Sequence, residues 1–115
     1  EDEEGKRLPF AQAATGAIGI ETLLPLALEM FHNESLTLNK IIETLTINPS
    51  KILKINKGTL KEGADADLCI LDLNAPWVVK ADKLKSKSKN TAIEGRKLQG
   101  KILMTYLNGE LVFKE

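Results

Sequence analysis

The sequence has little of what a metal centre or a nucleophilic triad needs. Its 115 residues include one histidine, His32, and one cysteine, Cys69. Metal sites need several clustered His, Cys or carboxylate ligands, and these two residues lie on different predicted elements. We therefore expect no catalytic residue and no metal ligand in this chain. His32 is expected to be solvated at a helix end, and Cys69 to be a small core residue of a strand.

Other absences limit the class of protein. Lys and Arg together number 16, as do Asp and Glu, so the net charge is zero. This balance gives no reason to expect a nucleic-acid or membrane partner. No apolar run approaches the ~20 residues of a membrane span. A single cysteine cannot form an internal disulfide, which fits a reducing compartment, so a cytoplasmic location is expected.

The start and the length of the chain suggest a piece of a longer protein. The chain opens on Glu-Asp-Glu-Glu and has no initiator methionine. An acidic start is the opposite of a basic signal-peptide start. A length of 115 residues suffices for one small domain, whereas a whole (β/α)8 barrel needs ~250 residues.

The first half of the chain has helical periodicity. Apolar residues recur at helical spacing from Ile18 to Ile55. One helix is predicted from about Glu21 to His32, and a second to begin near Thr37, a good N-cap. A third short helix is predicted with Asn48 as its N-cap, Pro49 at its first position and Ile52, Leu53 and Ile55 facing inward.

The second half reads mainly as strand and turn. Asn108-Gly109 predicts a tight hairpin turn, because both positions tolerate positive φ. The predicted segments are a short strand within Lys57–Gly63, a strand at Leu68–Leu73 buried on both faces, a strand at Trp77–Val79, a loop from Lys83 to Gly95, and hairpin strands at Lys101–Leu107 and Glu110–Phe113.

Two charged groups have a functional and a plain interpretation. Asp65, Asp67 and Asp72 do not have the spacing of a calcium loop. We expect Asp65 and Asp67 to shape a turn and Asp72 to end a strand. Lysines alternate through the predicted loop and could form an anion patch, but an exposed loop face is the favoured interpretation at zero net charge; they are Lys83, Lys85, Lys87 and Lys89.

The segment Gly16-Ala17-Ile18-Gly19-Ile20-Glu21-Thr22 is the local motif with functional promise. Its glycines let a backbone approach a ligand closely just before a helix, where free N–H groups can hold polar atoms. A tight loop packed under the helix is the simpler interpretation, and spacing alone favours it.

Several segments in order resemble the dihydroorotases, a family of cyclic amidohydrolases. Ala14-Thr15-Gly16-Ala17-Ile18-Gly19-Ile20-Glu21-Thr22 resembles the segment after the last barrel strand of that family. Further segments agree in the same order: Pro9-Phe10, Leu24-Pro25-Leu26, Leu36-Thr37-Leu38, Leu45-Thr46-Ile47-Asn48-Pro49, Gly63 to Asp72, Ser86 to Thr91, Gly95, Gly100 to Thr105, and Asn108 to Val112. The resemblance covers nearly the whole chain and identifies it as similar to the closing segment of such an enzyme.

The resemblance implies an α+β fragment of a larger fold. Residues 1–56 would be the last helices of a TIM-type (β/α)8 barrel, including a substrate loop. Residues 57–115 would supply C-terminal strands of an accessory β-sandwich built from both chain ends. The family also implies one or two zinc ions, whose ligands would all lie upstream of Glu1.

The resemblance assigns one pair of site residues. Thr15 and Gly16 match the family's short backbone pair that hydrogen-bonds the pyrimidine ring of the substrate, (S)-dihydroorotate or N-carbamoyl-L-aspartate. The chain departs from the family at Thr15, where an apolar residue is common, and at Ala92, where proline is common. The first departure weakens the ligand assignment slightly, and the second loosens a loop.

Three functional hypotheses follow. The parent protein is an active dihydroorotase of pyrimidine biosynthesis, a sister enzyme of the allantoinase or dihydropyrimidinase type, or a non-catalytic scaffold serving a partner such as aspartate carbamoyltransferase. The Pro9-Phe10 start and Ser86 to Thr91 favour the first. The segment alone is expected to be inactive, to pack on the N-terminal part of the same enzyme, and to belong to a homo-oligomer.

Overall fold

The computed structural model describes residues 3–115 and has an α+β architecture, as predicted. Glu1 and Asp2, part of the acidic start, lie outside the described residues. In chain order the elements are α1 (Glu3–Lys6), α2 (Leu23–His32), α3 (Leu38–Leu45), α4 (Ile47–Leu53), β1 (Leu68–Val78), the 3₁₀ turn η1 (Ala81–Lys83), β2 (Lys97–Leu107) and β3 (Glu110–Lys114).

Helices α2 and α3 follow the predicted pattern closely. Helix α2 ends at His32 as predicted and begins at Leu23, two residues later than expected. Pro25 occupies its first turn, where a missing N–H breaks no helical hydrogen bond. The Lys40 N–H donates to Thr37 Oγ1 at 3.3 Å, which confirms Thr37 as the N-cap of α3.

Helix α4 differs from the prediction in its start and in its exposed face. It begins at Ile47 after Thr46, so Asn48 lies inside the first turn instead of capping it. The Thr46 hydroxyl donates to the Ile42 carbonyl at 2.6 Å, which ties this junction to α3. The predicted inward face is wrong for this chain: Ile52 is 80% exposed, and Leu53 and Ile55 are exposed too, because no described element covers them.

The three strands form one antiparallel sheet with β2 in the centre. Strand β1 joins the two strands that were predicted separately, and Asp72 does not end it. Asp72 pairs with Lys101 and Pro76 with Gln99, so β1 carries extra residues between these pairs. The Asp72 carboxylate accepts the N–H groups of Asn74 and Ala75 at 2.9 and 3.1 Å, and thereby stabilises this bulge.

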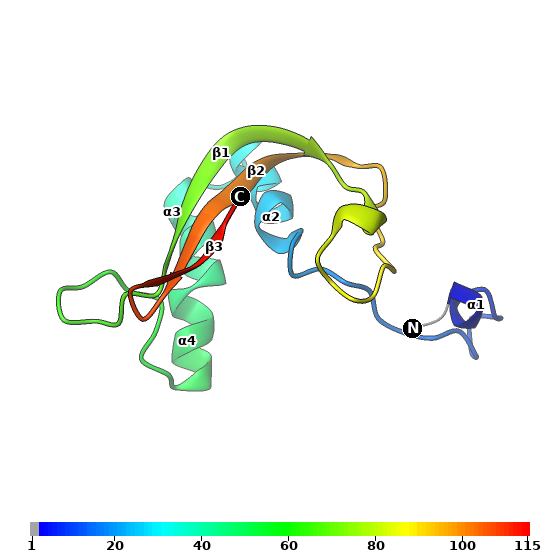
Figure 1. The fold of residues 1–115 in the computed structure, drawn as a ribbon, viewed down its shortest axis with the longest axis horizontal. Coiled ribbons are helices and arrows are strands. Elements are labelled where there is room, and N and C mark those ends of the chain that lie inside the picture. Colours follow the sequence, from blue (N-terminus) through cyan, green and yellow to red (C-terminus); the bar gives the residue numbers. More distant parts are fainter. Residues whose placement is uncertain (1–2) are drawn as a thin grey trace.

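The bulge lets the sheet arch over α2 (Figure 1). Gly100 of β2 lies opposite it with φ +104°, and a Cβ built there would come within 2.4 Å of Leu28 Cδ1. Leu28 is fully buried, and the Trp77 Nε1–H donates to the Gly100 carbonyl at 3.1 Å. Glycine at position 100 is therefore required both by the backbone conformation and by the close approach of α2.

The hairpin between β2 and β3 confirms the Asn-Gly prediction. Asn108 and Gly109 have φ values of 51° and 81°, as a two-residue turn of this kind requires. The Asn108 N–H donates to Asp67 Oδ1 at 2.8 Å, and the Gly109 N–H donates to the Ala66 carbonyl at 3.1 Å. The hairpin turn is thus fastened to the loop before β1. The short strand predicted within residues 57–63 is wrong, because this segment is irregular.

The core is small because the sheet has a single layer in this chain. The buried hydrophobic residues are Leu28, Ile41, Val79, Leu84 and Leu98. The segment Leu68–Leu73 was predicted to be buried on both faces. This prediction is wrong, because Ile70 is 44% exposed. Cys69 is exposed as well, so its prediction as a core residue is wrong.

The surface area is large for a chain of this length. The accessible surface is 8775 Å², whereas a compact monomer of the same mass exposes about 6,200 Å². The radius of gyration is 16.5 Å, against about 13 Å for a compact domain of this length. The elements therefore leave open faces that this chain does not cover.

Candidate functional site

The candidate site is the segment 14–22, which runs between α1 and α2 (Figure 1). Thr15 and Gly16 are exposed, and Gly16 has φ +86°. A Cβ built on Gly16 would meet no atom within 4 Å. Glycine is therefore favoured here by backbone conformation, and the space beside it is open to a ligand.

Backbone carbonyl groups of this segment converge on one cation. The Lys6 ammonium group donates to the carbonyl oxygens of Ala14 at 3.0 Å, Thr15 at 3.4 Å and, more closely, Gly16. Backbone carbonyl oxygens of this kind accept N–H groups of a ligand in the same way as they accept an ammonium group. The arrangement suits recognition of an amide-containing molecule through the backbone.

A second loop, residues 84–91, holds the segment in place. The Asn90 Nδ2–H donates to the Gly16 carbonyl at 3.1 Å, and Ile18 forms an isolated parallel bridge with Thr91. The Glu21 carboxylate accepts the N–H groups of Lys85 at 3.0 Å and Ser86 at 3.1 Å. Hydrogen bonds thus join the two loops at two places, near Gly16 and at Glu21, although the loops are more than 60 residues apart in sequence.

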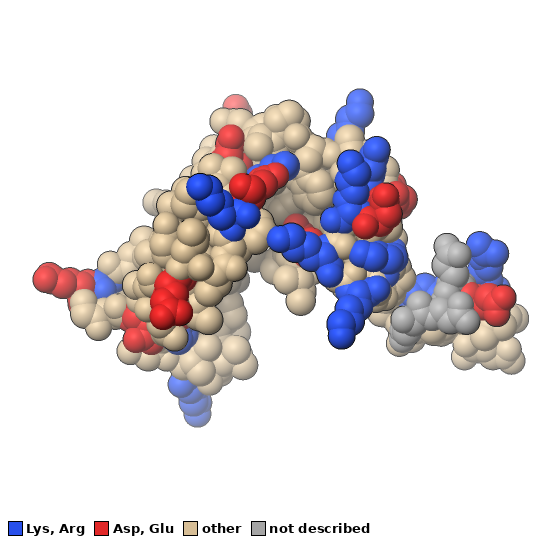
Figure 2. All heavy atoms as spheres, in the orientation of Figure 1, with Lys and Arg blue, Asp and Glu red and all other residues tan. Residues whose placement is uncertain are grey.

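A groove of about 1290 Å³ begins where the segment continues past Gly16. Residues 17–22 and the start of α2 form one wall, and β1, the loop after it, β2 and β3 contribute the others. Figure 2 shows basic side chains gathered over this part of the surface. The lysines that line the groove are Lys80, Lys83, Lys85, Lys101 and Lys114. Thr15 and Gly16 stand just outside the lining.

The lysines of the predicted loop are exposed, as expected. They are nevertheless not all solvated. The Lys85 ammonium group lies 4.3 Å from the centre of the Phe113 ring, and the Lys89 ammonium group donates to the Leu84 carbonyl. These contacts order the loop and do not define an anion site.

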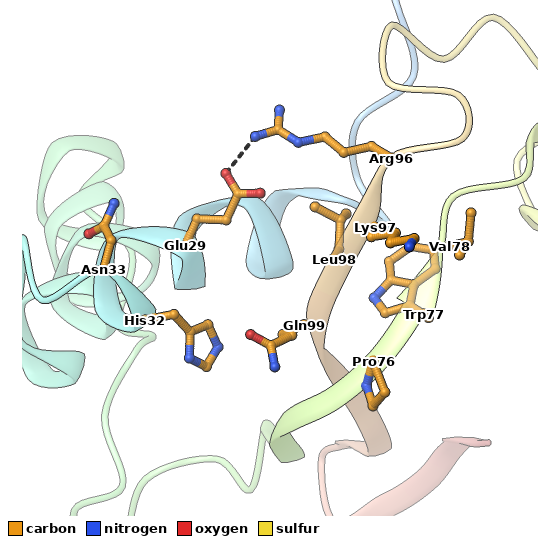
Figure 3. Close-up of a pocket in the computed structure, with 10 residues that line it drawn as sticks. All are labelled: Glu29, His32, Asn33, Pro76, Trp77, Val78, Arg96, Lys97, Leu98 and Gln99. Atoms are coloured by element: carbon orange, nitrogen blue, oxygen red, sulfur yellow. Dashed lines mark hydrogen bonds and ion pairs between the residues drawn. The ribbon is translucent and has the colours of Figure 1, made fainter.

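A second cavity of about 700 Å³ lies between α2 and the strands β1 and β2 (Figure 3). Glu29 and Arg96 form an ion pair at 2.8 Å on its wall. His32, predicted to be solvated, is half-buried, and its Nε2 lies 3.0 Å from the Leu73 carbonyl at the β1 bulge. His32 therefore links α2 to the sheet.

The described residues do not provide a metal centre. Within residues 3–115, no group of three or more His, Cys, Asp or Glu side chains is placed to hold a metal ion. His32 and Cys69 have separate neighbours, and Cys69 Sγ lies 3.7 Å from Thr105 Oγ1.

Asp65 and Asp67 pair with a lysine, in keeping with a turn-shaping role. The Lys57 ammonium group lies 2.8 Å from Asp65 and 2.5 Å from Asp67. The hydrogen bonds that the Lys57 ammonium group donates to Asp65, and then to Asp67, raise the pKa of Lys57 above 10.5. The Lys57 hydrogen bond, followed by the Asn108 N–H, lowers the pKa of Asp67 below 3.8.

Comparison with known proteins identifies the family. The model of the amidohydrolase family matches residues 5–112, almost the entire chain. The chain belongs to the amidohydrolase family. The dihydroorotase of Acetivibrio thermocellus is 46% identical over 111 residues, which are 96% of this chain and 26% of the relative. The dihydroorotase of Ehrlichia chaffeensis is 43% identical over 98% of this chain and 25% of its own length.

A solved structure agrees with this assignment. The L-hydantoinase (dihydropyrimidinase) from Arthrobacter aurescens matches 90% of this chain and 24% of its own chain, with a TM-score of 0.82 and 36% identity. The resemblance to dihydroorotases seen in the sequence is confirmed. This amidohydrolase chain spans about a quarter of the length of the relatives it matches. None of the helices described in residues 3–115 is long and apolar enough to cross a bilayer.

Sequence reasoning missed the residues that hold the candidate segment. These residues are Lys6, Glu21 and Asn90, and their contacts span 8 to 74 positions of sequence. Periodicity and motif spacing report only local relations, so these contacts leave no such signal. The Ser86 to Thr91 resemblance marked the second loop but not what it touches.

Proposed function

We propose that this chain is part of a dihydroorotase, which reversibly hydrolyses (S)-dihydroorotate to N-carbamoyl-L-aspartate in de novo pyrimidine biosynthesis. The observation that carries the proposal is the 46% identity with a dihydroorotase over 96% of this chain. The chain covers about a quarter of such relatives, so the activity belongs to a longer parent protein.

The fold is consistent with a role as one part of that parent. In our proposal residues 1–56 are the last helices of the barrel, and residues 57–115 are strands of the accessory sandwich. All four described α-helices lie in the first range, and the 3₁₀ turn η1 and all three described strands lie in the second. The exposed apolar face of α4 and the open faces of the sheet are then contact surfaces for the remainder of the enzyme.

Thr15 and Gly16 are the proposed substrate-contacting residues. Their backbone groups would hydrogen-bond the pyrimidine ring, with the Thr15 side chain secondary. The support is their exposure, the open space at Gly16, and the carbonyl oxygens that already accept hydrogen bonds from the Lys6 ammonium group.

The zinc of the parent enzyme would be held by residues outside this chain. The described residues do not fit a metal ion, since they offer no cluster of suitable ligands. Zinc in the parent would activate water for attack on the ring amide. The isolated chain is therefore expected to bind no stoichiometric zinc and to have no turnover.

This expectation has a direct check. Metal analysis of the purified chain by mass spectrometry, combined with a dihydroorotate assay, should find neither bound zinc nor turnover above background. One tightly held zinc per chain, or measurable turnover, would contradict it.

A sister cyclic amidohydrolase is the second candidate. The 36% identity and the TM-score of 0.82 with an L-hydantoinase favour it specifically. Assays of the full-length parent with dihydroorotate, hydantoin and dihydrouracil separate the two. We expect turnover of dihydroorotate to exceed that of the others; a preference for hydantoin or dihydrouracil would reverse the assignment.

The remaining proposals concern the oligomeric state, the location in the cell and a partner protein. We propose a cytoplasmic homo-oligomer that binds a small-molecule substrate. A non-catalytic dihydroorotase-like scaffold for aspartate carbamoyltransferase is the third reading. Zinc-dependent turnover by the purified parent alone would exclude it.

A further inference from the structure

One side chain far along the sequence holds the segment that we propose to touch the substrate. The Asn90 Nδ2–H donates to the Gly16 carbonyl at 3.1 Å across 74 positions of sequence. The backbone carbonyl of Asn90 in turn accepts the Ile18 N–H at 3.4 Å. The same residue therefore holds the backbone on both sides of Ala17.

The orientation of the Asn90 amide is set by its own neighbour. The Ser88 hydroxyl donates to Asn90 Oδ1. Because the oxygen is occupied by a donor, the nitrogen is the end of the amide that faces the Gly16 carbonyl. Both ends of the side chain are thus satisfied in one orientation.

Fixing the Gly16 carbonyl also fixes the next backbone donor. The carbonyl of residue 16 and the N–H of Ala17 belong to one planar peptide unit and point in opposite directions. Gly16 has φ +86° and no Cβ to limit its conformations, so the hydrogen bonds that its carbonyl accepts from Asn90 and from the Lys6 ammonium group restrain its backbone. Ala17 is the first residue of the groove wall, and Asn90 lies outside the groove lining. Asn90 therefore acts on the groove through the backbone of residues 16–18.

We propose that Asn90 is a positioning residue for substrate binding, because it holds the Gly16–Ala17 peptide in the orientation that recognises the ring amide of a cyclic substrate. This inference rests on the proposed function. Asn90 does not touch the substrate itself.

The test compares variants of the full-length parent enzyme. Asn90→Asp keeps the shape of the side chain but places a carboxylate oxygen, with no N–H, opposite the Gly16 carbonyl. Asn90→Ala removes the hydrogen bond without adding charge. We expect each variant to raise the KM for dihydroorotate roughly tenfold while kcat changes less, since one hydrogen bond that orients a ground-state contact is lost.

The matched control is Asn39→Ala, which removes an exposed asparagine from α3. Its KM and kcat should equal those of the wild type. A merely structural role for Asn90 would reduce the fraction of folded enzyme, so kcat would fall with KM unchanged. That result, or an unchanged KM in both Asn90 variants, would overturn the inference and leave the proposed function standing.

The two proposals fail in different ways. Absence of dihydroorotate turnover by the wild-type parent would overturn the proposed function, and the positioning of dihydroorotate with it. If the parent instead turns over hydantoin, the KM for hydantoin in the Asn90 variants decides whether the residue positions the substrate.

Discussion

At Gly16 the backbone adopts φ +86° beside open space, and the segment contributes its own carbonyl oxygen, which accepts hydrogen bonds from the Lys6 and Asn90 side chains. In our proposal the segment acts through its main chain, and residue identity matters mainly through the backbone conformations it allows. A change at Gly16 should affect substrate contact, whereas a change confined to the Thr15 side chain should not.

Gly16→Val in the parent enzyme should lower kcat/KM at least roughly tenfold, because a branched residue disfavours positive φ and would crowd the ring. Thr15→Ala should be mild, since the backbone groups remain. Gly63→Val is the control for strain alone, because Gly63 also has positive φ and open space but lies before β1. Steady-state kinetics check this prediction. Normal kinetics for Gly16→Val would show that Gly16 does not contact the substrate.

The charges around Asp67 make a pH-dependent contribution to stability. The pKa of Asp67 is lowered below 3.8, so the stability that the pair with Lys57 provides is complete above pH 3.8. It is lost as the pH falls through the lower, folded-state pKa. The pKa of Lys57 is raised above 10.5, so its part is complete below pH 10.5 and is lost as the pH rises further.

Asp67→Asn should therefore lower the Tm at pH 7, and the difference from wild type should shrink below pH 3.8. The effect is small because the Lys57 side chain is 41% exposed and screened by solvent. Thermal melts across pH 2.5–7 check this, with the exposed Asp82→Asn as a control. A Tm difference that stays constant across this range would show that the ion pair is not its source.

At the scale of elements, the packing of α2 against β2 depends on Gly100. Gly100→Ala would place a Cβ 2.4 Å from the fully buried Leu28, and φ is +104° there. Gly63→Ala has a similar φ of +83° but meets nothing within 4 Å. Gly100→Ala should exceed Gly63→Ala in destabilisation by about 1–3 kcal/mol, the usual cost of overpacking a core. Urea unfolding of the parent enzyme measures the loss of stability in both variants. Equal losses would mean that the core rearranges around Leu28 at no cost.

Local signals predicted the elements that depend on local chemistry. Thr37 capped α3 as expected, and Asn108-Gly109 formed the hairpin turn. The sequence predicted a strand that stops at Leu73, with Asp72 at its end. In the structure Asp72 instead stabilises a bulge, and pairing with β2 carries the strand to Val78.

Errors in burial share one cause. Cys69 and Ile70 belong to an apolar strand, and Ile52 belongs to an apolar helix face, so the pattern predicts a core. The pattern shows that a side chain is suited to burial, but not which chain supplies the covering layer. In residues 3–115 that layer is lacking, and these side chains are exposed. The glycines of residues 16–22 marked the candidate segment, but Thr15 and Gly16 were assigned to a ligand only by family resemblance, because the contacts that support the segment are long-range.

At the scale of the whole molecule, exposed apolar residues mark the faces that need a partner. Phe10 is fully exposed and Ile20 is 95% exposed, and the total surface exceeds that of a compact monomer by roughly 2,500 Å². Strand β1 also has one edge that β2 does not cover. We therefore propose that the chain is one part of a larger amidohydrolase and has little stability of its own.

Urea unfolding of the isolated chain, followed by Trp77 fluorescence over a tenfold range of protein concentration, tests this claim most directly. We predict either a broad transition at low urea or a midpoint that rises with concentration as copies associate through the open faces. A steep, cooperative transition of a monomer, independent of concentration, would show that the segment is an autonomous domain and would contradict the account.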